Sequence, residues 1–432
     1  MKAKRITLLT SLTVTGLIAG YFAPLSPDFP GAAFAGGTKL TPTETYLSVL
    51  KTIRADYAPQ TPGGKSPDER TLTYAAIDGM LAALHDRYTE FWTPDEYTRN
   101  MEETSGVFAG IGATLDTTAN GNIVVLQIVD GSPAAKMGVL PGDIVTQVDN
   151  HAVTGQTVDA VVEKIKGNAG TTVRLTLRRP NQTAPIQILL TRAMVVSPLV
   201  EARMLDKSRI GYVSLSLFGE NADSQFASAV ARLEKAGMRG LVFDLRDNPG
   251  GLLTVAQEIA SRFVPGGVVV WIQEKNGKMS PLTVEENKHQ GRLYTGKYPV
   301  VVLVNGGSAS ASEIVAGAIK DHHAGTLVGN RTFGKGLVQT IFPLDDDSAV
   351  KITTQHYFTP NKTDINKKHD PRTGNVSGGG IAPDVAVDLT DVDWERMQQA
   401  RRDAPGDPLA AGRHDPQLQK AVTVLQAQLE TR

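Results

Sequence analysis

Short apolar runs alternate with amphipathic stretches between residues 209 and 342, and this alternation limits the architectures open to the chain. Strands that are apolar along their whole length are typical of a sheet covered on both faces. The region is therefore expected to form a βα-layered core in a multidomain α/β protein. In chain order, the predicted strands are Ile210–Leu217, Gly240–Leu245 and Pro299–Val304, and the predicted helices are Ala222–Lys235, Leu253–Phe263 and Ser312–Lys320.

Length and composition exclude several classes of protein. The chain has 432 residues, too many for one hydrophobic core, which predicts two or three domains. Its net charge is −1, without the basic excess of a nucleic-acid-binding protein, so no nucleic-acid partner is expected. It contains no cysteine, which excludes disulfides and thiolate metal sites, and no metal or other cofactor is expected.

Residues 1–35 have the layout of an export signal. Basic residues precede the apolar run Ile6–Ala23, and Ala33-Phe34-Ala35 follows as a small-x-small site. The run is near the lower length limit for a spanning helix, and the gap to Ala35 is long for a cleaved signal. An uncleaved membrane anchor therefore stays open. In either case the rest of the chain is expected outside the cytoplasm, in the periplasm or cell envelope or secreted.

Residues 36–105 are predicted to form a helical region. A helix-start signal occurs three times, each with a capping hydroxyl, a proline and a glutamate three residues after the hydroxyl. The three signals are Thr41-Pro42-Thr43-Glu44, Ser66-Pro67-Asp68-Glu69 and Thr93-Pro94-Asp95-Glu96. At the other end, the polar tail 391–432 shows one late helical pattern, Pro416–Leu429.

Residues 106–194 change to short alternating strands with two short helices, Ser132–Met137 and Thr157–Lys166. The region resembles a PDZ domain in Phe108–Gly112 and in Gly131-Ser132-Pro133-Ala134 followed by Leu140-Pro141-Gly142-Asp143. A glycine-flanked turn exposes backbone N–H groups that can hold a terminal carboxylate. The candidates here are Ala109, Gly110, Ile111 and Gly112; the alternative is a plain hairpin turn. The predicted strands are GIGATL, NIVVLQIV, GDIVTQVD, TTVRLTLRR and IQILL.

Three polar loops, at residues 244–251, 305–314 and 330–339, follow the apolar strands of the core, where ligands of open α/β sheets usually bind. One of them, NGGSASASEI, holds Ser308, Ser310 and Ser312. Ser310 and Glu313 form a capping-box pattern, so Ser310 is either a helix cap or a nucleophile beside the free N–H groups of a helix start. The Gly-x-Ser-x-Gly pattern of α/β-hydrolases is absent.

A serine nucleophile needs a proton acceptor, and Lys335 is the best candidate. His322 and His323 lie at the far end of the predicted helix, about 15 Å from Ser310. Lys335 lies between two glycines in an apolar setting, where desolvation can lower the pKa of a lysine enough to make it a base. Gln339, four residues later, is placed to orient the amine.

The segment around Lys335 also nearly matches a phosphate-binding loop. The match fails because Gly336 replaces the hydroxyl residue that binds magnesium, and because the following LVQTIF is predicted as a strand instead of a helix.

Taken together, the chain resembles the carboxyl-terminal processing proteases, which are tail-specific Ser-Lys peptidases. The resemblance covers about Leu40 to Leu429 and includes DLRDNPGG, SASASE, TFGKGLVQ and GGIAPD, with a polar insertion at Lys367–Ser377 as a local departure. It implies a crotonase-like βα protease core, placed here at 195–390, with the PDZ domain inserted before it. It further implies Ser310 as nucleophile, Lys335 as base and Gln339 as the third member. Ala311 and either Gly250 or Gly251 would supply the oxyanion amides.

The expected function is therefore an exported serine endopeptidase that cleaves proteins near their C-terminus. Its partners would be protein or peptide substrates with free C-termini, held by the PDZ domain. The rival interpretations are a catalytically inactive PDZ scaffold and a nucleotide hydrolase. Membrane association through the N-terminus, a homodimer and an activating partner all stay open.

Overall fold

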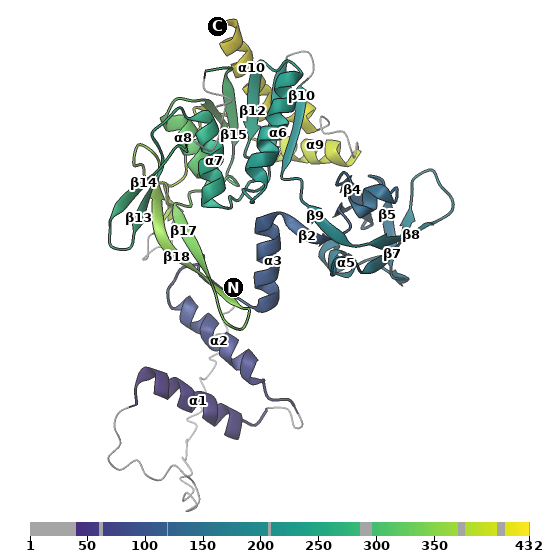
Figure 1. Ribbon diagram of the computed structural model, residues 1–432, viewed down its shortest axis with the longest axis vertical. Helices are drawn as coiled ribbons and strands as arrows, with labels where there is room; N and C mark the ends of the chain where they lie inside the picture. The colour runs from purple at the N-terminus through teal and green to yellow at the C-terminus, as the bar shows by residue number, and fades with distance from the viewer. Residues whose placement is uncertain are drawn as a thin grey trace, which may run out of the picture. The chain divides into compact units, whose positions relative to one another are not determined.

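The computed structural model describes residues 40–59, 64–118, 120–205, 209–285, 296–369, 376–403 and 411–431. The predicted export signal lies outside these residues. No helix among the described residues is long and apolar enough to cross a membrane. The chain forms two compact units, Met1–Ile77 and Asp78–Arg432 (Figure 1).

Two of the three predicted helix starts are confirmed. Thr41 caps α1 (Pro42–Asp56) and Thr93 caps α3 (Pro94–Ser105), each in a reciprocal capping box with a glutamate. The prediction at Ser66 is wrong: α2 (Glu69–Ala82) begins later, and the Asp68 carboxylate accepts the Thr71 N–H at 2.8 Å. Aspartate is as good an N-cap as serine, and Asp68 adjoins the first helical residue.

The predicted helical region is not helical throughout. Residues Glu90–Trp92 form β1, which pairs antiparallel with β18 (Ala349–Phe358), about 260 positions later in the chain. A three-residue strand has too little periodicity to be found locally.

The next region has the predicted five strands and two helices of a PDZ-like arrangement, together with three short strands that were not predicted, β2, β6 and β9. Its residues Val125, Val145 and Leu177 belong to a hydrophobic core separate from that of the peptidase region. The sheet order is β3-β4-β5-β7-β8, with β6 (His151–Ala152) beside β5, and β2 pairs with β9. The bounds are β2 Val107–Gly110, β3 Ala113–Thr117, β4 Ile123–Ile128, α4 Pro133–Lys136, β5 Ile144–Val148, α5 Val158–Ile165, β7 Thr172–Arg178, β8 Ile186–Thr191 and β9 Ala193–Val196.

The central sheet of the following region has the order β10-β11-β12-β15-β16-β21. Strands β11 to β21 run parallel, and β10 pairs antiparallel at the edge. The three predicted strands and three predicted helices are confirmed, with ends shifted by at most two residues. The bounds are β10 Val200–Leu205, β11 Ile210–Leu215, α6 Ala222–Lys235, β12 Gly240–Asp244, α7 Leu253–Phe263, β15 Val300–Val304, α8 Ala311–Asp321, β16 Thr326–Gly329 and β21 Val385–Ala386.

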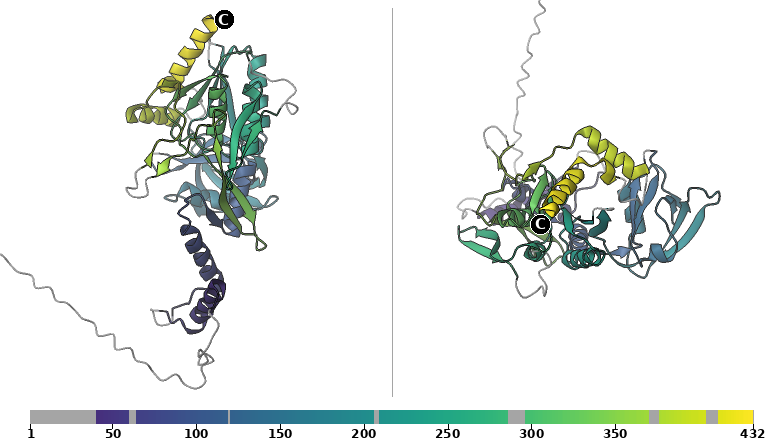
Figure 2. Two further views of the ribbon diagram at one scale, coloured as in Figure 1. Left: turned by 90° about the vertical axis from the view of Figure 1, so that its left-hand side faces the viewer. Right: turned by 90° about the horizontal axis from the view of Figure 1, so that it is seen from above.

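Helices cover both faces of this sheet, which explains why its strands are apolar throughout. Residues of α6, α7 and α8 share one core with alternate strand residues such as Phe243 and Val302. The intervening residues Val242 and Val301 face α10 (Pro416–Glu430), the predicted late helix (Figures 1 and 2).

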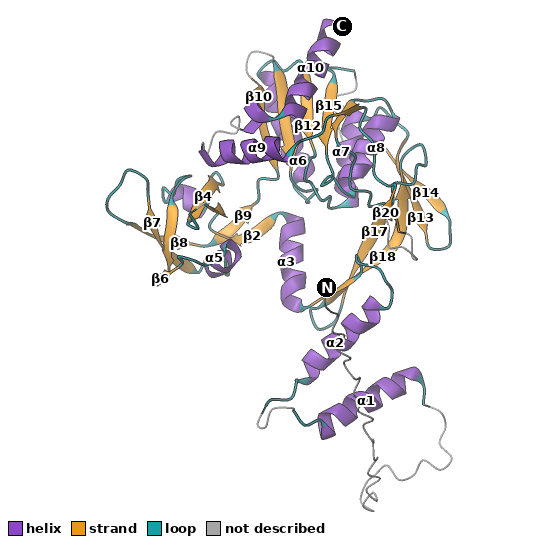
Figure 3. Ribbon diagram, turned by 180° about the vertical axis from the view of Figure 1, so that it is seen from behind, coloured by secondary structure: helices purple, strands orange, loops and turns teal. Residues whose placement is uncertain are grey.

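A second, antiparallel sheet was not predicted as a unit. It contains β1, β18, β13 and β14, with β17 beside β18 (Figure 3). Only β17, the strand expected after the lysine loop, had been predicted. The remaining bounds are β13 Val268–Glu274, β14 Met279–Thr283, β17 Leu337–Pro343, β19 Lys368–His369, β20 Val376–Ser377, α9 Asp391–Asp403 and η2 Ala411–His414.

Candidate active site

The parallel strands bring the three polar loops to one edge of the central sheet. Strands β12, β15 and β16 are adjacent, with Asp244 opposite Leu303 and Val304 opposite Gly329. Because parallel strands end at the same edge, the loops that follow them lie close together. The Phe333 N–H donates to the Ser308 carbonyl at 2.9 Å, and the Ala309 N–H donates to the Asn248 carbonyl at 3.0 Å, which joins all three loops.

Two of the three serines have structural roles. The buried Ser308 hydroxyl donates to the Leu245 carbonyl at 2.7 Å, and the buried Ser312 hydroxyl donates to the Asn248 carbonyl at 2.9 Å. Both bonds attach the serine cluster to the loop after β12. Ser308 and Ser312 therefore hold the loop around Ser310 in place.

Ser310 differs from both in its backbone. It is the N-cap of α8 with φ 54° and ψ −113°, a region that only glycine adopts without strain. The same kind of sharp, strained turn holds the exposed nucleophile of α/β-hydrolases, although the sequence pattern here differs. Strain of this kind persists only where the surrounding structure enforces it.

Lys335 lies on the loop between β16 and β17 and is partly buried. Burial, and next the nearby Lys351 charge, lower the pKa of Lys335 to about 8, against the opposing pull of Glu90, Asp86 and Glu313. Its Nζ atom lies 4.7 Å from the centre of the Tyr88 ring. A lysine in this setting is partly neutral near physiological pH and can act as a base.

Two side chains join the Ser310 and Lys335 loops. The Glu313 Oε2 atom accepts the Ser310 N–H at 3.0 Å and the Lys335 N–H at 2.8 Å. The Tyr357 hydroxyl donates to the Ser310 carbonyl at 3.0 Å and also contacts the Lys335 carbonyl. Within the described part of the chain, the Ser310 hydroxyl and the Lys335 amine share no hydrogen bond.

Gln339 does not contact Lys335 by a hydrogen bond. Its amide donates to the Thr353 hydroxyl at 3.2 Å, and a register shift between Val338 and Gln339 breaks the simple alternation of faces along β17. The structure therefore places Gln339 near β18, where the expected contact to the amine is not made.

The predicted oxyanion amides lie in two different settings. The Ala311 N–H, at the first position of α8, donates to no group among the described residues. The Gly250 N–H donates to the Asn248 side chain at 2.9 Å, whereas the Gly251 N–H has no partner in the described structure. Gly250 packs so closely that an added Cβ would lie 2.8 Å from the Ser310 Cβ.

The predicted carboxylate-binding turn of the PDZ region is divided between two settings. Ala109 and Gly110 belong to β2 and pair with β9. The Ile111 and Gly112 N–H groups donate to nothing in the part of the chain described here. Gly112 has φ 76°, and a Cβ there would lie 2.3 Å from the Ser132 Cβ, so only glycine fits.

Comparison with known proteins identifies the family to which the chain belongs. Residues 209–387 match the model of peptidase family S41, and residues 124–179 match a PDZ domain. The chain is 36% identical over 326 residues to a carboxy-terminal-processing protease of Bartonella bacilliformis, covering 74% of this chain and 71% of the relative. It is 35% identical over 325 residues to a carboxyl-terminal-processing protease of Synechocystis sp., covering 74% and 72%.

This chain belongs to the carboxyl-terminal-processing proteases of peptidase family S41. The matched ranges lie inside the predicted PDZ and peptidase regions. A probable CtpA-like serine protease of Staphylococcus epidermidis is 37% identical over 339 residues, and this chain spans 64% of its length. A solved S41 protease from Bacteroides fragilis, 14% identical with a TM-score of 0.53, covers 91% of this chain and 99% of its own and shares the fold.

Sequence reasoning missed several residues of the candidate site. Tyr357 and Tyr88 carry no local pattern, and Glu313 was noticed only as half of a capping box. Asp86 and Glu90 lie in a segment that was assigned to the helical region. Burial raises the pKa of the Asp86 carboxyl, but hydrogen bonds led by that from Thr353 lower it by more, leaving a carboxylate near Lys335.

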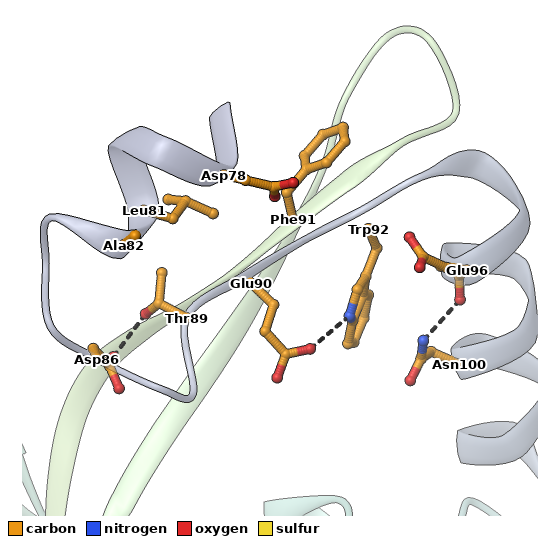
Figure 4. Close-up of a pocket in the computed structure, with 10 residues that line it drawn as sticks. All are labelled: Asp78, Leu81, Ala82, Asp86, Thr89, Glu90, Phe91, Trp92, Glu96 and Asn100. Carbon is orange, nitrogen blue, oxygen red and sulfur yellow. Dashed lines mark hydrogen bonds between the residues drawn. The ribbon is translucent and has the colours of Figure 1, made fainter. Parts of the chain in front are cut away.

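The same segment lines a cavity of about 500 Å³ (Figure 4). Within it, Thr89 donates to Asp86 at 2.7 Å and the Trp92 ring nitrogen donates to Glu90 at 3.0 Å. Asp86 and Glu90 thus border both this cavity and the surroundings of Lys335. The lining residues are Asp78, Leu81, Ala82, Asp86, Thr89, Glu90, Phe91, Trp92, Glu96 and Asn100.

Proposed function

We propose that this protein is an exported serine endopeptidase that uses a Ser310–Lys335 dyad to cleave proteins near their C-terminus. The observation that carries the proposal is the meeting of the two loops. A strained serine at a helix start and a partly buried lysine with a pKa of about 8 are joined through shared hydrogen-bond partners.

In the proposed reaction, neutral Lys335 takes the proton of the Ser310 hydroxyl as its oxygen attacks the substrate carbonyl. The lysine side chain first turns from the Tyr88 ring toward Ser310, as its flexible stem allows. The lysine then gives the proton to the leaving amine, and an acyl-enzyme remains on Ser310. A water molecule, deprotonated by the same lysine, hydrolyses this ester and releases the second product.

The oxyanion of each tetrahedral intermediate would be held by the amides of Ala311 and Gly251. Each such donor contributes about 3 kcal/mol to stabilisation of the transition state. Gly251 is favoured over Gly250 because the Gly250 amide is engaged by Asn248. Gly250 instead provides the close packing that lets its loop approach Ser310.

The PDZ domain would hold the substrate's terminal carboxylate at the Ile111 and Gly112 amides. Strand β3 pairs only with β4 in the described sheet, so an extended peptide can add to its other edge, next to α5. Two peptides that differ only in a free or amidated C-terminus test this role by calorimetry. The free acid is expected to bind and the amide to bind at least tenfold more weakly; equal affinity contradicts the role.

Ser310→Ala and Lys335→Ala test the dyad. Each is expected to abolish cleavage of unfolded β-casein while the thermal unfolding midpoint stays near that of the unmodified protein. Ser308→Ala is the matched control in the same cluster and should keep the nucleophile. Full activity in either dyad variant contradicts the mechanism, and no activity in the unmodified protein favours the inactive PDZ scaffold.

A further inference from the structure

Glu313 has contacts that a helix cap does not require. Its side chain is fully buried, and its two oxygens accept four hydrogen bonds. Besides the Ser310 and Lys335 N–H groups at Oε2, the Thr332 hydroxyl donates to Oε1 at 2.6 Å and the Gly334 N–H donates to Oε1 at 2.7 Å. A buried carboxylate is costly unless its oxygens are satisfied, and here three of the four donors lie outside its own helix.

The other capping boxes show what capping alone needs. In α3, the Glu96 carboxylate accepts the Thr93 N–H at 2.9 Å and the Thr93 hydroxyl at 2.8 Å, and in α1 Glu44 bonds Thr41 in the same way. Neither carboxylate has a hydrogen bond to a second loop among the residues that the structure describes. The position of Glu313 is thus ordinary for a capping box, and its remaining bonds serve another purpose.

Tyr357 completes the connection from the carbonyl side. Its side chain is 1% exposed, and its hydroxyl lies between the carbonyls of Ser310 and Lys335. Both residues are therefore held at their N–H by Glu313 and at their C=O by Tyr357. The direction in which each side chain leaves its backbone is fixed as a result.

We infer that Glu313 is a positioning residue for the proposed catalytic pair: one carboxylate fixes the backbones of Ser310 and Lys335 relative to each other and places a negative charge beside the lysine. The inference rests on the proposed Ser-Lys function. It concerns the same reaction but adds a residue that does not touch the substrate.

The charge of Glu313 gives the inference a readout that a structural role lacks. Burial and Lys351 lower the pKa of Lys335, whereas the carboxylates of Glu90, Asp86 and Glu313 raise it, and the Tyr88 ring faces the same amine. Burial raises the pKa of Glu313 itself, against the four hydrogen bonds that it accepts. Removing this one negative charge should lower the pKa of Lys335. The acid limb, meaning the fall of kcat/KM on the acidic side of its pH profile, should then shift to lower pH.

The test compares Glu313→Gln with Glu313→Asp in the full chain, with β-casein as substrate. Glu313→Gln keeps the shape and loses the charge, so we expect kcat to fall about a hundredfold from misplacement, with little change in KM and an acid limb at lower pH. Glu313→Asp keeps the charge but shortens the reach, so kcat should fall while the acid limb stays in place. Glu96→Gln is the matched control and should leave kcat and the acid limb unchanged.

Circular dichroism and thermal unfolding separate positioning from folding. If Glu313→Gln is unfolded, Glu313→Asp and Tyr357→Phe carry the test, and each should lower kcat in folded protein without moving the acid limb. Unchanged kcat in the folded variants overturns the inference, as does a loss that only matches the loss of folded protein. If Ser310→Ala and Lys335→Ala are inactive while Glu313→Gln is normal, only this inference fails; if those two are active, the proposed function fails.

Discussion

The Nζ atom of Lys335 lies 4.7 Å from the centre of the Tyr88 ring, on a face where a cation is attracted to the ring's π-electrons. This contact favours the protonated amine, whereas burial favours the neutral one. The pKa of Lys335 is thus set by opposing effects, and single substitutions can raise or lower it.

The pH dependence of the unmodified enzyme follows from this balance. Only neutral Lys335 can accept a proton, and its pKa is about 8. Below that pH, kcat/KM should fall about tenfold for each pH unit, and above it kcat/KM should level off. Steady-state cleavage of a fluorogenic peptide between pH 6 and pH 10 (on the order of two units on either side of the pKa) measures this profile. A limb centred near the ordinary pKa of lysine would show that the amine is not desolvated in the free enzyme.

Tyr88→Leu and Lys351→Met should move this limb in opposite directions. Loss of the ring removes an attraction for the ammonium and lowers the Lys335 pKa by about half a unit. Loss of the Lys351 charge removes a repulsion and raises the pKa of Lys335. The same substitution also breaks the 3.0 Å salt bridge between Lys351 and Glu90, so that the Glu90 charge raises the pKa of Lys335 further. Tyr88→Phe keeps the ring and is the control. Shifts of the same sign in both variants would contradict this electrostatic picture.

Ser310→Gly should be more stable than Ser310→Ala, although both are inactive. Glycine adopts φ 54° and ψ −113° without strain, whereas alanine retains the Cβ that causes it. Removal of the backbone strain stabilises the glycine variant, and the backbone entropy cost of glycine offsets part of that gain. The net difference in the free energy of unfolding is about 1 kcal/mol in favour of Ser310→Gly. Urea denaturation of the two variants measures the difference. Equal stability would show that the turn is not strained.

Gly250→Ala should reduce kcat while the protein stays folded. The added Cβ would lie 2.8 Å from both the Ala309 carbonyl oxygen and the Ser310 Cβ, so the nucleophile or the oxyanion loop must move. A displacement of this size costs about a hundredfold in rate. Gly266→Ala, where no atom lies within 4 Å of the new Cβ, is the control. Equal kcat in the two variants would mean that the Gly250 loop adapts without disturbing the site.

Local patterns in the sequence predict much of the core but little of what surrounds the lysine. Apolar runs flanked by helical periodicity identified β12 and α8, because each is buried along nearly its whole length. The pairing of Glu90–Trp92 with β18 depends on contacts between distant segments, which no local pattern records. The lysine's environment follows from that pairing, since Tyr88 and Glu90 reach the site only through it.

The candidate nucleophile and base were predictable for a different reason. Both lie in small-residue loops after apolar strands, and the resemblance to a known family named them. Their roles stay predictions, as does the role of Gln339, whose bond to Thr353 does not favour it. Glu313 shows what a local motif cannot predict. The capping box was recognised in the sequence, but the hydrogen bonds that Glu313 accepts from Thr332 and Gly334 depend on where those residues lie in space.

The packing of helix α10 bears on whether the proposed peptidase can cleave its own chain. Its residues Leu418, Ala421 and Leu425 are buried against the central sheet, and Asp415, just before it, bonds Arg246 at 2.7 Å. A peptidase that takes up extended chains cannot accept a segment that is helical and packed in this way. While α10 is packed, residues 416–430 are thereby withheld from the proposed active site of another copy, and cleavage within them would first require α10 to detach from the sheet and unwind.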